Sequence, residues 1–298
     1  MIAAAIDLGT NTTRLLVAEI ENGSVDELHR ETRITRLGEG VDDRRRLLPV
    51  PIARVRNALS DYRRTAESLE AERTLLVATS AVREAENGEA FLGEIEWSYG
   101  FATRLVSGDE EAELTRRGTD PAPRTLVVDI GGGSTELILD DFHVSLPVGS
   151  VRFTERYGED VGRIGAATRR QLDLPIEPRA AIGVAGTVTT LAALDLGLDR
   201  YDRDRVHGHR LARAAAHEQL RRLAALTVDE RRALPAMEPG RAPVIVAGAA
   251  ILVATLEHFD LEQLEVSEHD LLDGIALAAA ELPARIEGDA PPGAYTCC

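Results

Sequence analysis

Two stretches of the sequence, 122 residues apart, repeat the same order of apolar and small polar positions. In residues 2–20 and 124–142, an apolar run ends in Asp-x-Gly, a loop of Gly, Thr and Ser follows, and a second apolar run closes the stretch. This order predicts two strands joined by a tight turn. Gly gives the loop backbone freedom, while Thr and Ser place hydroxyls beside exposed N–H groups, a combination suited to phosphate. The repeat therefore predicts duplicated halves facing a cleft, with two acidic residues available for a divalent cation.

Between and after these stretches, strand patterns alternate with helix patterns. Apolar positions spaced three and four apart predict a helix over residues 51–72. Strands that lead into helices are predicted over 74–88 and 100–118, and again in the second half of the chain. There the predicted elements are a strand that becomes a helix at Gly186 and Thr187 within 180–194, an amphipathic helix over 209–234, and another strand-to-helix passage over 242–259.

A polar break with two prolines, TDPAPR at 119–124, precedes the second repeat and is the predicted domain boundary. The sequence thus predicts a first domain over 1–118 and a second domain over 119–285, whose last helix can pack back on the first. Residues 286–298, with Cys297 and Cys298, are predicted to be a flexible tail. With no other cysteine, an internal disulfide framework or cysteine zinc site is excluded.

Composition narrows the chemistry further. A hydrophobic content of 44% over 298 residues is enough for two ordinary domains, and no apolar run approaches the roughly 20 residues needed to span a bilayer. The start of the chain lacks a leader pattern, so we expect a cytoplasmic protein with no membrane partner. A formal charge of -16 argues against nucleic acid as a partner. All 34 basic residues are Arg, which leaves guanidinium groups, backbone N–H groups and a metal to bind phosphate.

Seven segments, in this order, resemble the exopolyphosphatase and guanosine pentaphosphate phosphatase (Ppx/GppA) family of the actin, Hsp70 and sugar-kinase superfamily. They are DLGTNTTRLL at 7–16, TSAVREAENG at 79–88, SGDEEAE at 107–113, VVDIGGGSTE at 127–136, LPVGSVRFTE at 146–155, VAGTVTTLAAL at 184–194 and VSEHDLLDGI at 266–275. The resemblance implies an α/β fold of two duplicated ribonuclease-H-like domains with an interdomain cleft. It also implies a hydrolase that removes terminal phosphate from a phosphoanhydride as orthophosphate, with Mg²⁺ or another divalent cation.

By the same resemblance, Glu111 corresponds to the carboxylate that activates water, and Asp129 and Glu136 correspond to positioners of metal and water. Glu136 is therefore expected both as a catalytic residue and as a metal ligand, together with Asp129 and Asp7. A lone Glu in a helix's first turn is commonplace, and Asp beside Gly is ordinary turn chemistry. Only the seven-segment context favours catalysis. Arg14 stands in the first repeat where Glu136 stands in the second, so the hairpins are expected to differ in charge.

Phosphate contacts are expected from both loops and from one arginine. Arg83 resembles the family's cleft arginine and can neutralise phosphate bidentately. Gly186 and Thr187 resemble a loop that approaches a nucleotide in related folds, although a tight strand-to-helix connection also explains them. The expected phosphate-binding residues are Thr10, Asn11, Thr12, Thr13, Arg83, Gly131, Gly132, Gly133, Ser134 and Thr135.

The sequence also departs from the family pattern and leaves three functions open. Glu113 stands where many members have Arg, which removes a positive charge that would bind polyphosphate. The additional C-terminal helical domain of longer relatives is not expected, so the expected preference is for shorter polyphosphates or a nucleotide. The leading function is an exopolyphosphatase acting on inorganic polyphosphate, and the alternative is a guanosine pentaphosphate 5'-phosphatase. A third possibility is a catalytically weak regulator that binds either ligand. An actin-like kinase is conceivable from the fold alone. Family membership also implies a homodimer.

Overall fold

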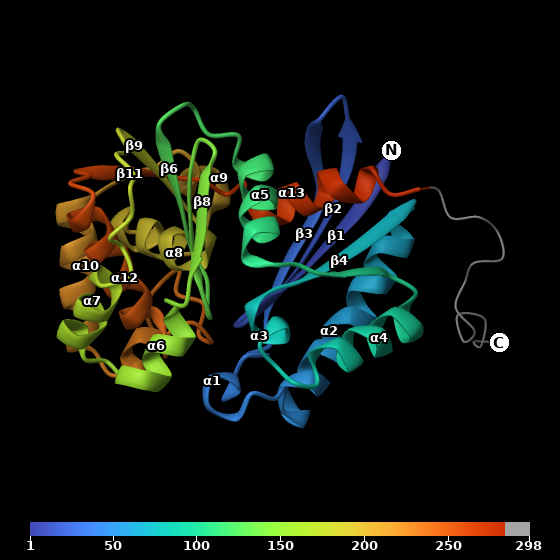
Figure 1. The fold of residues 1–298 in the computed structure, drawn as a ribbon, viewed down its shortest axis with the longest axis horizontal. Helices are drawn as coiled ribbons and strands as arrows, with labels where there is room; N and C mark the ends of the chain where they lie inside the picture. Colours follow the sequence, from blue (N-terminus) through green and yellow to red (C-terminus); the bar gives the residue numbers. More distant parts are fainter. Residues whose placement is uncertain (284–298) are drawn as a thin grey trace. The chain divides into compact units, whose positions relative to one another are not determined.

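The computed structural model describes residues 1–283, and these form two compact units. The first unit combines residues 1–118 with the segment that begins at Leu271, and the second unit is Thr119–Asp270. Each unit is a β-sheet with helices packed on it (Figure 1). The sequence-based division ended the second domain at residue 285, whereas here the last helix belongs to the first unit.

The predicted tail at 286–298, with Cys297 and Cys298, lies outside the described residues. Within residues 1–283, no helix is long and apolar enough to cross a membrane.

The first unit has a five-stranded sheet in the order β3-β2-β1-β4-β5. Strands β1, β2 and β3 pair antiparallel, whereas β4 and β5 extend the sheet parallel to β1. The strands are β1 (Ile2–Leu8), β2 (Thr12–Glu21), β3 (Ser24–Ile34), β4 (Arg73–Ala78) and β5 (Ala102–Leu105). The helices are α1 (Val41–Arg44), α2 (Pro49–Ser68), α3 (Ser80–Arg83), α4 (Gly88–Tyr99), α5 (Gly108–Thr119) and α13 (Leu271–Ala280).

Strand β1 is apolar on both faces because helices cover both sides of this sheet. Ala4, Ile6 and Leu8 join a buried cluster with residues of α2 and α4. Ala3 and Ala5, which point to the opposite face, join a second cluster with residues of α5 and α13. A continuous apolar run is the pattern expected of a strand that is buried on both faces.

The second unit repeats this order and adds one strand. Its sheet has the order β10-β11-β9-β6-β7-β8, in which β6, β7 and β8 pair antiparallel and β9 and β11 continue parallel to β6. The strands are β6 (Thr125–Ile130), β7 (Thr135–Leu139), β8 (Phe142–Leu146), β9 (Ala180–Val184), β10 (Arg210–Ala212) and β11 (Gln263–Val266). The helices are α6 (Ser150–Tyr157), α7 (Val161–Arg169), α8 (Ala185–Asp195), α9 (Arg203–Val206), α10 (Arg213–Ala225), α11 (Val228–Arg232) and α12 (Ile245–His258).

The order β8-β7-β6-β9-β11 reproduces β3-β2-β1-β4-β5 strand for strand, with the same directions. An antiparallel meander of three strands followed by two parallel strands is the ribonuclease-H-like topology. The predicted fold class, an α/β protein with two duplicated domains of this type, is confirmed.

Two predicted elements differ from the structure. The single helix expected over 209–234 begins as strand β10 and is broken before Thr227, whose hydroxyl and backbone form a capping box with Glu230 and start α11. The strand expected at the start of 242–259 is wrong, because α12 occupies this apolar run from Ile245. An apolar run buried on all sides has no periodicity that separates strand from helix.

Candidate functional site

In the first unit, the predicted residues gather at one edge of the sheet. Because β1, β4 and β5 are parallel, their carboxyl ends adjoin: Leu8 pairs with Ala78, and Ala78 with Leu105. The chain segments that leave these three ends carry the first loop, α3 with Arg83, and α5 with Glu111. Functional loops commonly gather at the carboxyl ends of parallel strands.

The start of α5 is set by a reciprocal cap. The Ser107 backbone N–H donates to the Glu110 carboxylate at 2.8 Å, and the Glu110 backbone N–H donates to the Ser107 hydroxyl at 3.2 Å. The hydrogen bond from the Ser107 backbone N–H, with a smaller contribution from the Ser107 side chain, holds the pKa of Glu110 below its ordinary value. The cap fixes where the helix begins, and it thereby places Glu111 on the first turn, where the positive end of the helix dipole favours a carboxylate.

Glu111 and Arg83 form a partly buried ion pair. Arg83 Nη1 donates to the Glu111 carboxylate at 3.2 Å and to the Val106 carbonyl at 2.8 Å. The Glu111 side chain is 8% exposed and that of Arg83 is 27% exposed. A buried carboxylate keeps its charge when a cation lies beside it. The structure thus brings together two residues that the sequence placed in separate motifs, 28 positions apart.

The carbonyl groups of the first loop accept hydrogen bonds from a supporting segment at residues 35–38. The Gly9 N–H closes the turn on the Thr12 carbonyl, while the carbonyls of Thr10 and Asn11 accept from Gly38 N–H at 2.8 Å and from Arg36 N–H at 2.9 Å. In a trans peptide the N–H points opposite to the carbonyl. The N–H groups of Asn11 and Thr12 therefore point away from this supporting segment.

The hydroxyls of this loop have protein partners. Thr10 shares a hydrogen bond of 2.9 Å with Ser80 of α3, and Thr13 shares one of 2.9 Å with Thr35. Ser80 had no role in the sequence interpretation, although it lies in the segment that carries Arg83. Both pairs fix the rotamers of the predicted phosphate-binding threonines.

The second loop, Gly131–Thr135, is supported by the start of α6. The Ser150 N–H donates to the Gly131 carbonyl at 3.0 Å, and the Val151 N–H donates to the Gly132 carbonyl at 2.8 Å. Arg152 Nε donates to the Gly133 carbonyl at 2.6 Å. By the same peptide geometry, the N–H groups that follow each of these carbonyls point away from α6. Successive N–H groups with one orientation make an anion-binding concavity.

Two acidic side chains face each other across the hairpin that holds this loop. Asp129 on β6 pairs in register with Glu136 on β7, and the residues are 6% and 1% exposed. Side chains in such a pair share one face of the sheet, with Cβ atoms about 5 Å apart. The Ser145 hydroxyl on β8 donates to Glu136 Oε1 at 2.7 Å. The hairpin therefore buries two carboxylates on one face.

Asp7 occupies the equivalent place in the first hairpin but faces a cation. It pairs in register with Arg14, whose Nε and Nη2 both lie 2.8 Å from Asp7 Oδ2. The predicted difference in charge between the hairpins is thus a feature of the structure.

Gly186 and Thr187 lie in the first turn of α8, next to the second loop. Strand β9 ends at Val184, which pairs with Asp129, so α8 starts at the same sheet edge. Arg241 lies against Gly186 so closely that any side chain there would overlap its guanidinium, and Arg241 Nη1 donates to Thr190 at 3.5 Å. Arg241 is not among the residues predicted from the sequence, because no local motif marks it.

The described residues contain no group of three or more His, Cys, Asp or Glu side chains arranged to hold a metal ion. Asp129 and Glu136 supply hard oxygen ligands for two positions. Mg²⁺ commonly binds through one or two carboxylates, with water and substrate phosphate oxygens as its other ligands. This donor set therefore fits a magnesium ion that is bound together with a phosphorylated substrate.

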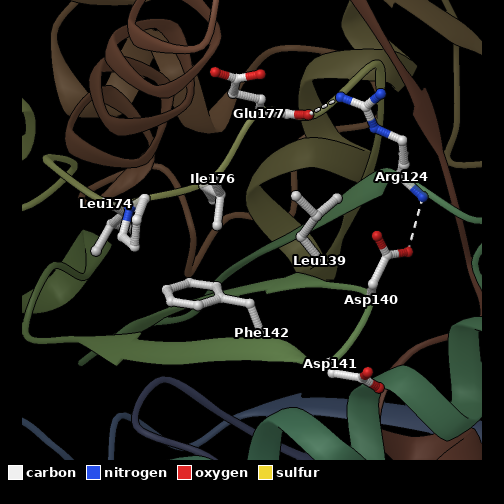
Figure 2. A pocket seen from close by; sticks show the side chains of 9 residues that line it. Arg124, Leu139, Asp140, Asp141, Phe142, Leu174, Ile176 and Glu177 are labelled. Carbon is white, nitrogen blue, oxygen red and sulfur yellow. Dashed lines mark hydrogen bonds between the residues drawn. The ribbon is translucent and has the colours of Figure 1, made fainter.

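A separate pocket of about 740 Å³ lies at the other end of the β6–β7 hairpin (Figure 2). Leu139, Phe142 and Ile176 form its apolar part, and Arg124 closes one side by donating to the Glu177 carbonyl at 2.9 Å. None of the predicted site residues lines it.

The duplicated topology, with loops and carboxylates at the carboxyl edges of both sheets, defines an α/β protein of the actin, Hsp70 and sugar-kinase superfamily. Residues 16–281 match the model of the Ppx/GppA phosphatase family. Exopolyphosphatase 2 of Mycobacterium tuberculosis is 41% identical over 313 residues, which cover 93% of this chain and 98% of that protein. The chain belongs to the Ppx/GppA phosphatase family.

Solved structures agree with this assignment. The crystal structure of an exopolyphosphatase-like protein superimposes with a TM-score of 0.87 at 33% identity, covering 95% of this chain and 100% of the other. A Ppx/GppA family member from Aquifex aeolicus superimposes with a TM-score of 0.79 at 30% identity, covering 95% and 99%. The predicted family is confirmed, and with it the prediction of an enzyme that hydrolyses phosphoanhydride bonds.

Proposed function

We propose that this chain is an exopolyphosphatase that hydrolyses the terminal phosphoanhydride bond of inorganic polyphosphate. The observation that carries the proposal is the buried Glu111 on the first turn of α5, ion-paired with Arg83. The 41% identity to a protein named exopolyphosphatase supports the choice of polyphosphate over other phosphoanhydrides.

In this mechanism Glu111 acts as the general base. A water oxygen forms a bond to the terminal phosphorus, the bridging P–O bond breaks, and the proton of the water passes to Glu111. Arg83 orients the Glu111 carboxylate through one hydrogen bond, and the rest of its guanidinium group is offered to a phosphate oxygen. Since a phosphate is already a good leaving group, positioning and charge neutralisation account for most of the rate.

The loop residues bind the chain of phosphates. Several of their N–H groups point away from the supporting segments, and the hydroxyls of Thr10 and Thr13 are held by neighbouring side chains. The residues proposed for this role are Thr10, Asn11, Thr12 and Thr13 in the first loop and Gly131, Gly132, Gly133, Ser134 and Thr135 in the second. Gly186 and Thr187 are proposed as further ligand contacts, with Arg241 as their neighbouring cation.

Asp129 and Glu136 are proposed to hold a divalent cation, with Mg²⁺ as the expected ion. When bound, such an ion neutralises phosphate oxygens as charge develops in the transition state. Ser145 orients Glu136 by its hydrogen bond. Asp7 remains a predicted ligand, and its pairing with Arg14 makes it the one whose substitution is most informative.

The experiment is orthophosphate release by the purified protein with Mg²⁺, offered defined short polyphosphate, long polyphosphate and guanosine pentaphosphate in parallel. Release from polyphosphate, lost in Glu111→Gln, is the expected result. Release only from the nucleotide would assign the alternative function, and binding without release would favour the regulator. Unchanged release by Glu111→Gln would refute the proposed base. A cytoplasmic location, a homodimer and a preference for short chains remain predictions.

A further inference from the structure

Helices α5 and α13 of the first unit are neighbours (Figure 1), and their backbones come into contact at Gly274 and Leu114. Gly274 of α13 lies against Leu114 of α5, where a Cβ at position 274 would overlap the Leu114 carbonyl oxygen and lie 2.7 Å from its carbonyl carbon. Contacts below 3.0 Å are essentially absent for real Cβ atoms. The obstacle is backbone, so a side chain at 274 could be accommodated only by moving a helix.

Leu114 lies one helical turn after Glu111, on the same short helix. The two Cα atoms are about 4.5 Å apart along the helix axis. Glu111 is tied to this turn, because its carbonyl accepts the Thr115 hydroxyl at 2.9 Å. A hydrogen-bonded helix moves as a body, so a displacement at Leu114 reaches Glu111.

Helix α13 is itself held firmly to the first unit. Arg30 of β3 donates to both carboxylate oxygens of Asp273 at 3.1 Å, and Asp273 is 2% exposed. At the other end of the helix, Arg73 of β4 donates to the Ala280 carbonyl. The helix is therefore a fixed surface against which α5 rests, since its neighbours anchor it at both ends.

We propose that Gly274 is a positioning residue for hydrolysis, which sets the place of Glu111 through its backbone contact with Leu114. The inference rests on the proposed role of Glu111 as the general base. An added methyl group at 274 displaces α5, and with it the carboxylate, from the water it activates. A misplacement of about 1 Å costs roughly a hundredfold in rate.

The test compares Gly274→Ala in the native background and in the Glu111→Gln background, with phosphate release from polyphosphate as the readout. In the native background we expect kcat to fall about 10- to 100-fold while KM changes little, because substrate binding is untouched. In the Glu111→Gln background, the same substitution is expected to cause no further loss. Two changes that act through one group are not additive.

Gly93→Ala is the matched control, because Gly93 is also a helical glycine of the first unit but has open space where the Cβ would lie. Its kcat is expected to be unchanged. Where Gly274→Ala does not fold, Asp273→Asn loosens the anchor of α13 and carries the same test. The expected result is then a several-fold loss of kcat that vanishes in the Glu111→Gln background.

Equal losses of kcat in both backgrounds would mean that position 274 acts through general stability. This result would overturn the inference about Gly274 and leave the proposed function intact. Full kcat in Gly274→Ala, or in Asp273→Asn where that variant replaces it, would overturn it too. Full activity of Glu111→Gln by itself would refute the proposed base, and the inference with it.

Discussion

The hairpins β1–β2 and β6–β7 close their loops with the same hydrogen bond at equivalent positions. The Gly9 N–H donates to the Thr12 carbonyl at 2.9 Å, and the Gly131 N–H donates to the Ser134 carbonyl at 3.0 Å. Their charges differ, because Asp7 faces Arg14 in the first hairpin and Asp129 faces Glu136 in the second. The two hairpins thus share a backbone shape, but the first carries an Asp–Arg ion pair and the second carries two carboxylates.

The two loops are also supported in different ways. The carbonyls of the first loop accept N–H groups from the irregular segment at residues 35–38, whereas the carbonyls of the second loop accept the first N–H groups of α6. Helix α6 has no side-chain cap, since its N-cap residue is Gly149. The carbonyls of the second loop and the first N–H groups of α6 therefore satisfy each other's hydrogen bonds. We expect substitutions at this contact to destabilise the protein more than substitutions where the first loop meets its supporting segment.

The largest effect is expected from making the second hairpin resemble the first. Glu136→Arg would set a cation opposite Asp129, as Arg14 stands opposite Asp7, and would remove the proposed metal site. Phosphate release should fall at least about a hundredfold, because a metal ion supplies several kcal/mol to such a reaction. Mn²⁺ binding, measured by electron paramagnetic resonance, should be lost as well.

Glu136→Gln is the milder control for this change, because it keeps the shape of the side chain and the hydrogen bond from Ser145. It should weaken Mn²⁺ binding without abolishing folding. Metal binding of native strength in Glu136→Arg would show that the ion binds elsewhere.

The next largest effect is a difference in unfolding free energy between variants of Asp7 and Asp129. Asp7→Asn leaves Arg14, with a side chain 15% exposed, without its full partner, and is expected to cost about 3 kcal/mol. Asp129→Asn, measured without metal, should cost less, because the residue opposite Asp129 across the hairpin is a carboxylate and not an arginine. Urea unfolding of the two variants in EDTA gives the comparison, and an equal loss for both would contradict it.

The sequence predicts the fold well where its signal is local. The repeat around Asp7 and Asp129 predicts both hairpins, and the topology places them at equivalent strands of the two sheets. It fails for α12, since an all-apolar run has no period, and the helix is buried because α7, α10 and α8 surround it.

The sequence predicts the residues of the candidate site that lie within its motifs, but not the contacts between motifs. Glu111 and Arg83 are each visible in a family segment, but their ion pair depends on the adjacent ends of β4 and β5. Support from Arg152 and the contact of Gly274 with Leu114 come from tertiary packing. No spacing in the sequence encodes them.

The difference in loop support predicts unequal costs for one added methyl group. In Gly149→Ala the Cβ would lie 2.6 Å from the Gly132 carbonyl carbon, so the second loop must move, at a cost of about 3 kcal/mol. In Gly38→Ala the nearest obstacle is the Thr10 methyl group, which can move aside if Thr10 gives up its hydrogen bond with Ser80, and about 1 kcal/mol is expected.

Thermal unfolding of both variants measures these costs, and KM for polyphosphate should rise more in Gly149→Ala because its phosphate-binding loop is displaced. Gly197→Ala would be unsuitable as a control, since its positive φ of 61° adds strain of its own. Gly93→Ala, in open space, serves instead. Equal destabilisation by Gly38→Ala and Gly149→Ala would show that the two supports are equally rigid.

The smallest effect concerns α5, which has the side-chain cap that α6 lacks. Ser107→Ala removes the hydroxyl half of the cap and is expected to cost about 1 kcal/mol. The backbone N–H of Ser107 makes the largest contribution to lowering the pKa of Glu110 below 4.5, so the stability from this bond is present above pH 4.5 and is lost as the pH falls through the lowered value. Native protein should therefore lose more stability between pH 5 and pH 3 than Glu110→Gln, which has no carboxylate to protonate there, as urea unfolding at each pH would measure. Parallel losses in the two proteins would show that the cap does not stabilise the helix that carries Glu111.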